Sequence, residues 1–237
     1  KPIYASNGVN LITICLAMAD IDNEQPISAL LFDNDGTLVD TLPLIYNILQ
    51  RVALELTIPQ IPWRRYVQAM MDNAPLMEML LQVAEEHGQS VSLDTASGLF
   101  QKQVRASLTV GQGVHAIEAT VAIARDAKAK GLPIAVVTAA PLLWARAMLA
   151  AAGLAELFSD CVIVAKDTPG LEREKPHPDP YLLAAKLLGV APEQCVGYED
   201  SDSGLEALRL AGMRAVDART LPGYPKHDLE SNVTSKL

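Results

Sequence analysis

Short apolar runs alternate along the chain with longer segments in which apolar residues recur at helical spacing. The short runs predict buried strands at residues 29–32, 132–137, 161–165, 195–198 and 214–217. Helical spacing predicts helices at residues 114–130, 142–152, 180–188 and 203–211, each stopped by a glycine. Strands that alternate with helices and are almost continuously apolar favour an α/β fold with a doubly wound parallel sheet, covered by helices on both faces.

Residues 42–110 interrupt this alternation. The apolar positions there predict helices and no strand, and Pro59 and Pro62 end the first helix. The predicted helices span residues 42–57, 63–72, 75–87 and 93–108. The pattern therefore predicts a block of helices inserted into the α/β chain, as a cap domain would be.

The pattern divides the chain into four parts. We expect a Rossmann-like core in residues 26–41 and 111–220, a helical cap in residues 42–110, a loosely ordered tail in residues 221–237 and an extension in residues 1–25. Met18 resembles a natural start, so we interpret residues 1–17 as vector-derived or misassigned upstream sequence. A signal peptide is the alternative. No stretch reaches the roughly 18–20 apolar residues of a membrane span.

Composition and charge narrow the range of partners. The 237 residues carry a net charge of −9 and a pI near 4.9, which argues against nucleic acid and against a membrane surface. Cys15, Cys161 and Cys195 lack metal-ligand spacing and lie in apolar runs, as buried thiols of a reducing cytoplasm would. We therefore predict a cytoplasmic protein, and the sequence leaves open whether it is a monomer or a homodimer.

The first predicted strand ends in two aspartates, Asp33 and Asp35, which are separated by one residue. Residues i and i+2 of a strand point to the same side, so the two carboxylates would leave the strand end together. Their mutual repulsion favours a cation nearby. Gly36 permits a tight turn, and Thr37 is expected to form a local hydrogen bond. An ordinary acidic turn is the alternative interpretation.

Other strands of the predicted sheet are also followed by polar residues. Thr138 precedes Ala139, where a hydroxyl and backbone N–H groups would suit a phosphate oxygen, although threonine is also a common helix cap. Lys175 lies among prolines that would stiffen its loop, although such a lysine is usually solvated. Glu199 and Asp200 follow an apolar strand, where some acids would ordinarily cap a helix.

Taken together, these residues resemble the four motifs of the haloacid dehalogenase superfamily, in the phosphatase and β-phosphoglucomutase-like subgroup. The stretch Asp-Asn-Asp-Gly-Thr-Leu-Val-Asp-Thr at residues 33–41 resembles the first motif, and the resemblance covers about residues 29–218. It implies a Rossmann-like core with a helical cap. It also implies a cap loop around Asn73 that selects the substrate.

The resemblance implies a role for each motif residue. Asp33 would be the nucleophile, and Asp35 the general acid and then the general base. Thr138 and Lys175 would hold the transferring phosphoryl group, with the backbone N–H groups of Asn34 and Ala139 facing it. The implied ligands of Mg²⁺ are Asp33, the backbone carbonyl of Asp35, Asp200 and Glu199.

The implied activity is that of a hydrolase: a Mg²⁺-dependent phosphatase that acts on a small phosphate monoester, such as a sugar phosphate, through an aspartyl-phosphate. Asp35 favours phosphate chemistry, because the dehalogenase branch lacks this second acid. A β-phosphoglucomutase-type phosphomutase is the alternative, but Ile45 stands where those mutases typically have histidine. A non-catalytic binding protein on the same fold is a further alternative.

Overall fold

The computed structural model describes residues 26–71, 74–110 and 114–227. By their internal contacts the described residues form two compact units, one of residues 26–39 and 115–225 and the other of residues 40–71, 74–110, 114 and 226–227. No helix in the described ranges combines the length and the apolar character of a membrane span.

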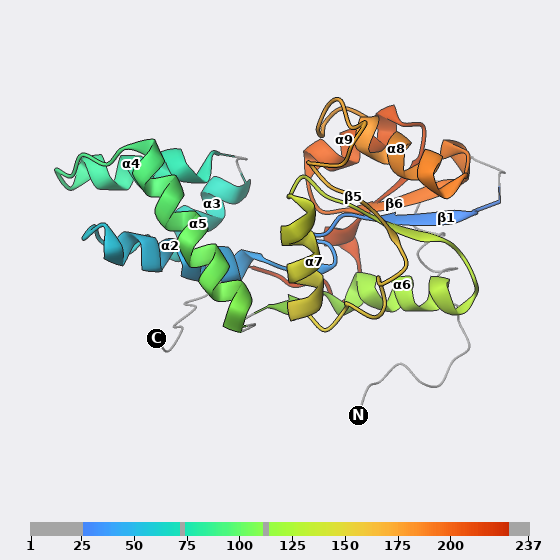
Figure 1. Ribbon diagram of the computed structural model, residues 1–237, viewed down its shortest axis with the longest axis horizontal. Helices are drawn as coiled ribbons and strands as arrows, with labels where there is room; N and C mark the ends of the chain where they lie inside the picture. The colour runs from blue at the N-terminus through green and yellow to red at the C-terminus, as the bar shows by residue number, and fades with distance from the viewer. Residues whose placement is uncertain (1–25, 72–73, 111–113, 228–237) are drawn as a thin grey trace. The chain divides into compact units, whose positions relative to one another are not determined.

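The first unit is built on a five-stranded sheet in which every neighbouring pair of strands is parallel (Figure 1). Its order is β5 (Val162–Val164), β4 (Ile134–Val137), β1 (Ala29–Phe32), β6 (Cys195–Glu199) and β7 (Arg214–Asp217). The residues of β1, β4 and β6 are buried throughout, as expected of central strands covered on both faces. The predicted doubly wound α/β fold is confirmed.

Helices cover both faces of this sheet. On one face lie α8 (Asp179–Leu188) and α9 (Asp202–Leu210), and α6 (Glu118–Ala129) lies on the other (Figure 1). The helix α7 (Leu142–Ala151) joins β4 to β5. Alternate residues of the strands pack under α8 and α9 in a continuous core, which includes Leu31, Val137, Val164, Tyr181, Ala184, Ala207 and Leu208. Two short 3₁₀ helices, η1 (Pro192–Gln194) and η2 (Ala218–Thr220), flank β6 and β7.

The start of α6 differs from the sequence prediction. The helix expected from residue 114 begins only at Glu118, because His115–Ala116 form the short strand β3, which lies beside β2 (Val39–Asp40). The Thr120 hydroxyl donates to the carbonyls of Ile117 and Thr37 and fixes this helix start. Two-residue strands are too short for their side-chain alternation to stand out in a sequence.

The second unit contains the inserted helices α2 (Leu42–Glu55), α3 (Trp63–Met71), α4 (Leu76–Glu86) and α5 (Leu93–Val110). Aromatic residues pack at its centre: the rings of Tyr46 and Trp63 meet edge to face at 4.9 Å, and Tyr66 is fully buried. The buried Gln50 amide holds the chain after α2 by hydrogen bonds with both backbone groups of Ile61. This unit is the helical insertion that the sequence predicts.

Several sequence expectations fall outside the described residues, among them the extension at residues 1–25, Cys15 and the loop around Asn73. The described part of the tail makes specific contacts rather than lying loose. Tyr224 donates its hydroxyl to the carbonyl of Gly36 at 2.7 Å, and His227 lies 2.9 Å from the carboxylate of Asp40. Of the other cysteines, Cys195 is buried and Cys161 is half-buried.

Candidate active site

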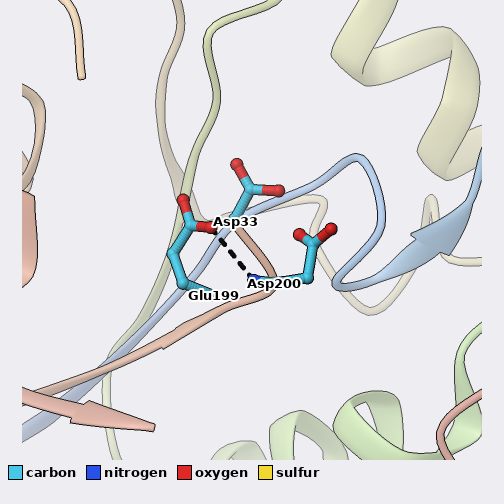
Figure 2. Close-up of side chains that lie close together, drawn as sticks. All are labelled: Asp33, Glu199 and Asp200. Carbon is cyan, nitrogen blue, oxygen red and sulfur yellow. Dashed lines mark hydrogen bonds between the residues drawn. The ribbon is translucent and has the colours of Figure 1, made fainter. Parts of the chain in front are cut away.

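The carboxyl ends of the adjacent strands β4, β1 and β6 meet at one edge of the sheet, where open α/β folds bind ligands. Oxygen atoms of Asp33, Glu199 and Asp200 lie within 4.8 Å of one another there (Figure 2). Lys175 reaches the same point from the loop before α8. The parallel topology therefore brings together side chains that are more than 160 residues apart in sequence.

Lys175 joins two of these carboxylates. Its Nζ lies 2.6 Å from Asp33 Oδ1 and 2.5 Å from Glu199 Oε1, and it also donates to the carbonyl of Val137 at 3.0 Å. Burial opposes a charged ammonium, but the carboxylates of Asp33 and Glu199 outweigh it and hold the pKa of Lys175 well above its usual value. The lysine is therefore a fixed cation inside the site.

The Glu199 carboxylate is surrounded by donors. Its Oε1 accepts from Lys175 and from the Tyr181 hydroxyl at 3.0 Å, and its Oε2 accepts from the N–H groups of Asp200 and Ser201 and from the Ser201 hydroxyl. Figure 2 shows the bond to the Asp200 amide. Burial would raise the pKa of Glu199, but Lys175 and the hydrogen bonds lower it. These contacts suit an ionised carboxylate that orients Lys175, and metal ligation by Glu199 stays a prediction.

Asp200 packs directly against the turn after Asp33. Its Oδ1 accepts the Thr37 hydroxyl at 2.9 Å, so Thr37 bonds across the site rather than locally as expected. A Cβ placed on Gly36 would lie only 2.1 Å from Asp200 Oδ2, and the φ of Gly36 is +87°. Both the backbone conformation and the close approach therefore require glycine at this position.

The donor set fits a hard divalent cation. No described residue donates a hydrogen bond to Oδ2 of Asp33 or Asp200, or to the backbone carbonyl of Asp35. Burial and the neighbouring carboxylates raise the pKa of Asp33, and they raise the pKa of Asp200 to about 7. A bound cation would relieve this repulsion, and oxygen ligands of this kind suit Mg²⁺.

The carboxyl group of Asp35 accepts hydrogen bonds from three neutral donors. The Trp144 indole donates to its Oδ1 at 3.3 Å, and Asn34 Nδ2 and the Thr138 hydroxyl donate to its Oδ2 at 3.0 and 3.4 Å. Burial raises the pKa of Asp35, while these hydrogen bonds oppose the rise. A carboxyl group of raised pKa that faces no cation within hydrogen-bond distance suits the exchange of a proton.

Backbone donors at the same edge suit an anion. In the described part of the chain, no hydrogen bond uses the N–H of Asn34 or of Ala139. Thr138 is buried at the end of β4, where its hydroxyl oxygen accepts from the N–H of Ala140 at 3.0 Å. Ala139 itself is exposed. These two amides and the Lys175 ammonium are the groups that a phosphate would meet.

The structure thus brings every sequence-predicted site residue to one edge of the sheet. Sequence reasoning missed Trp144 and Tyr181. Both stand at apolar positions of amphipathic helices, where an aromatic residue is ordinarily part of the core. The only available signal was chemical, since an indole N–H or a phenol hydroxyl that becomes buried usually has a hydrogen-bond partner.

Comparison with known proteins agrees with this architecture. A family model for haloacid dehalogenase-like hydrolases matches residues 27–212. Hexitol phosphatase A of Escherichia coli is 28% identical over 216 residues, which cover 87% of this chain and 93% of that protein. Fructose-1-phosphate phosphatase YqaB of Escherichia coli is 46% identical over 89 residues, which cover 38% of this chain and 45% of YqaB.

A solved structure shows the same fold. A haloacid dehalogenase family hydrolase from Deinococcus radiodurans, crystallised with bound phosphate and sodium, matches 80% of this chain and 80% of its own. The two share 31% sequence identity and a TM-score of 0.62. The family model covers most of the chain, including each strand end described above. The chain therefore belongs to the haloacid dehalogenase-like hydrolases.

Proposed function

We propose that this hydrolase is a Mg²⁺-dependent phosphatase that cleaves a small phosphate monoester through an aspartyl-phosphate on Asp33. The observation that carries the proposal is the convergence of Asp33, Asp200 and Lys175 at one strand edge. One oxygen of Asp33 is held by Lys175, and the other accepts no hydrogen bond from the described residues. The second oxygen is therefore available to a metal or to phosphorus.

Mg²⁺ would be held by Asp33, Asp200 and the backbone carbonyl of Asp35, with Glu199 as the remaining candidate ligand. When bound, it supplies positive charge that offsets the repulsion between a carboxylate nucleophile and a phosphate dianion. Lys175 adds a second, fixed cation. The N–H groups of Asn34 and Ala139 and the Thr138 hydroxyl would orient the phosphoryl oxygens.

In the first step, a carboxylate oxygen of Asp33 attacks phosphorus and forms a P–O bond. The bond between phosphorus and the ester oxygen breaks, and the leaving oxygen takes the proton that Asp35 carries. The burial that raises the pKa of Asp35 favours this protonated form at the start of the reaction. The products of this step are the free alcohol, the aspartyl-phosphate and an ionised Asp35.

In the second step, the Asp35 carboxylate takes a proton from water, and the resulting hydroxide attacks phosphorus. The bond between phosphorus and Asp33 breaks, which releases inorganic phosphate and restores both aspartates. The same side chain thus serves as acid and then as base. Trp144 and Asn34 hold it within reach of the reacting oxygens throughout.

The proposed substrate class is the phosphate esters of sugars and related metabolites. The support comes from relatives whose names specify hexitol phosphates and fructose 1-phosphate. The negative net charge agrees with a small ligand that is attracted locally rather than with a polyanion. The free thiols Cys161 and Cys195 agree with a cytoplasmic location.

Phosphate release from fructose 1-phosphate, hexitol phosphates and small phosphorylated acids tests the proposal, with Mg²⁺ or with excess EDTA. We expect release with Mg²⁺, a loss of at least 100-fold in EDTA, and a loss of at least 1,000-fold in Asp33→Asn. Exposed Asp94 on α5 provides a control, and Asp94→Asn should retain full activity. Activity that survives in Asp33→Asn would remove the proposed nucleophile.

The phosphomutase alternative is tested with β-glucose 1-phosphate. A phosphatase releases inorganic phosphate, whereas a mutase yields glucose 6-phosphate. The absence of histidine at Ile45 leads us to expect free phosphate. Accumulation of glucose 6-phosphate without phosphate would favour the mutase.

A further inference from the structure

The hydrogen bond between Trp144 and Asp35 connects α7 to the carboxyl group that is proposed to move the proton. Trp144 lies in the first turn of α7, and its Nε1 stands 3.3 Å from Asp35 Oδ1. The helix is anchored through other residues, since Ala145, Met148 and Leu149 are its buried positions. The indole ring itself remains partly exposed. Its polar contact is therefore better explained by the site than by the core.

The three donors around Asp35 differ in whether they can also accept a hydrogen bond. The Asn34 amide and the Thr138 hydroxyl, which both contact Oδ2, can each either donate or accept a hydrogen bond. An indole N–H can only donate. The Trp144 N–H therefore requires a lone pair on Oδ1 whether Asp35 is protonated or ionised. The groups that can either donate or accept a hydrogen bond both contact Oδ2.

The side-chain amide of Asn34 supports the same difference between the two oxygens of Asp35. Its Oδ1 is buried and has no hydrogen-bond partner among the described residues, while its Nδ2 donates to Asp35 Oδ2. An unpartnered buried acceptor is costly. Rotation of this amide by 180° would place the free oxygen against Asp35 Oδ2, where it could accept a proton carried there. No such adjustment is open to Trp144.

We propose that Trp144 is a positioning residue that fixes the orientation of the Asp35 carboxyl group, with Oδ1 as the constant acceptor and Oδ2 as the oxygen that exchanges the proton. The inference rests on the proposed function, because it takes Asp35 as the general acid and base. Trp144 acts through Asp35 and needs no contact with the substrate.

The test compares two aryl phosphates of similar size, p-nitrophenyl phosphate and phenyl phosphate, with Mg²⁺ present. Phenolate is the more basic leaving group and depends more on protonation by a general acid. Trp144→Phe keeps an aromatic ring and removes the N–H. We expect it to lower kcat/KM for phenyl phosphate at least tenfold and for p-nitrophenyl phosphate less than threefold, with KM changed less than twofold.

Two further variants serve as controls, one positive and one negative. Asp35→Asn should show the same selectivity for the leaving group to a greater extent, since it removes the acid itself. Leu143→Ala alters the neighbouring residue on α7, whose side chain is 80% exposed, and should behave as the unaltered protein. Thermal unfolding of Trp144→Phe should match that of the unaltered protein within about 2 °C.

The outcomes separate the two proposals. Equal losses on both substrates in Trp144→Phe, or no loss on either, would overturn the role of Trp144 while leaving the phosphatase intact. A larger loss on phenyl phosphate supports it. An unaltered protein that, with Mg²⁺, hydrolyses neither aryl ester nor the sugar and hexitol phosphates would overturn the proposed function, and the role of Trp144 with it.

Discussion

At the scale of single residues, the site is a buried group of charges that is not balanced by the described side chains alone. The side chains of Lys175, Asp33 and Glu199 are 7%, 10% and 1% exposed, and Asp200 adds a third carboxylate. One ammonium cannot offset three carboxylates. A buried charge without a partner costs several kcal/mol, so the arrangement favours a bound cation. A site arranged for cation binding gives up stability in the cation-free state.

Substitution of Tyr181 tests how the Glu199 carboxylate is held in the site. Tyr181→Phe removes the hydroxyl that donates to Glu199 Oε1 at 3.0 Å and keeps the ring under the sheet. Loss of a hydrogen bond to a charged acceptor should lower the free energy of unfolding by about 1.5–3 kcal/mol. Because Glu199 also orients Lys175, we expect kcat to fall severalfold. Urea unfolding and steady-state kinetics measure both, and an unchanged stability would contradict the assigned contact.

At the scale of elements, the start of α9 is fitted closely to the end of β6. Ser201 caps the helix, since its hydroxyl accepts the N–H of Gly204 and also donates to Glu199. A Cβ placed on Gly204 would lie 1.8 Å from Glu199 Oε1. The strand end and the helix start therefore leave no room for a side chain at this position.

Two glycine substitutions make a matched pair. Gly204→Ala would displace the Glu199 carboxylate from Lys175, and we expect at least a tenfold loss of kcat and a lower melting temperature. Gly98→Ala lies within α5, where an added Cβ meets nothing within 4 Å. It should stabilise the protein by about 0.5–1 kcal/mol through helix propensity alone. Circular dichroism melts and kinetics check both, and a fully active Gly204→Ala would contradict the close fit.

At the scale of the whole molecule, metal binding should change how stability depends on pH. The pKa of Asp200 is raised to about 7 in the cation-free protein, above its unfolded value near 3.8. Between these values the Asp200 carboxyl group binds more protons in the native state than in the unfolded state, so its contribution to the stability falls as the pH rises from about 4 to 7. The loss is fully present above pH 7, and amounts to about 1.4 kcal/mol per pH unit at most.

Mg²⁺ should reverse this trend. In the proposed site Mg²⁺ would bind the ionised carboxylates of Asp33 and Asp200, so its affinity should rise with pH and its binding should release protons. We expect Mg²⁺ to raise the melting temperature at pH 7.5 by several degrees and to have little effect at pH 5. Scanning calorimetry in Mg²⁺ and in EDTA measures this, and Asp200→Asn should lose the difference. Equal shifts at both pH values would contradict cation binding by these residues.

Much of this molecule could be predicted because its signals are local. The apolar runs from Ala29 to Phe32 and from Ile134 to Val137 predict the central strands, and the helical spacing of residues 42–110 predicts the inserted helices. The motif at Asp33 also predicts chemistry, because it places two acids directly after the end of one strand. The predicted start of α6 was wrong, because β2 and β3 are stabilised by pairing with each other. Such pairing is not a local property of the sequence.

The sequence by itself determined the class of fold and the residue types that carry the proposed chemistry, since both depend on short-range periodicity and on motif spacing. Only the tertiary structure decided the partners: Thr37 bonds Asp200, Tyr181 bonds Glu199 and Trp144 bonds Asp35. The physical reason is that a hydrogen bond depends on distances of about 3 Å between atoms, and these are set by how strands and helices distant in the chain pack together.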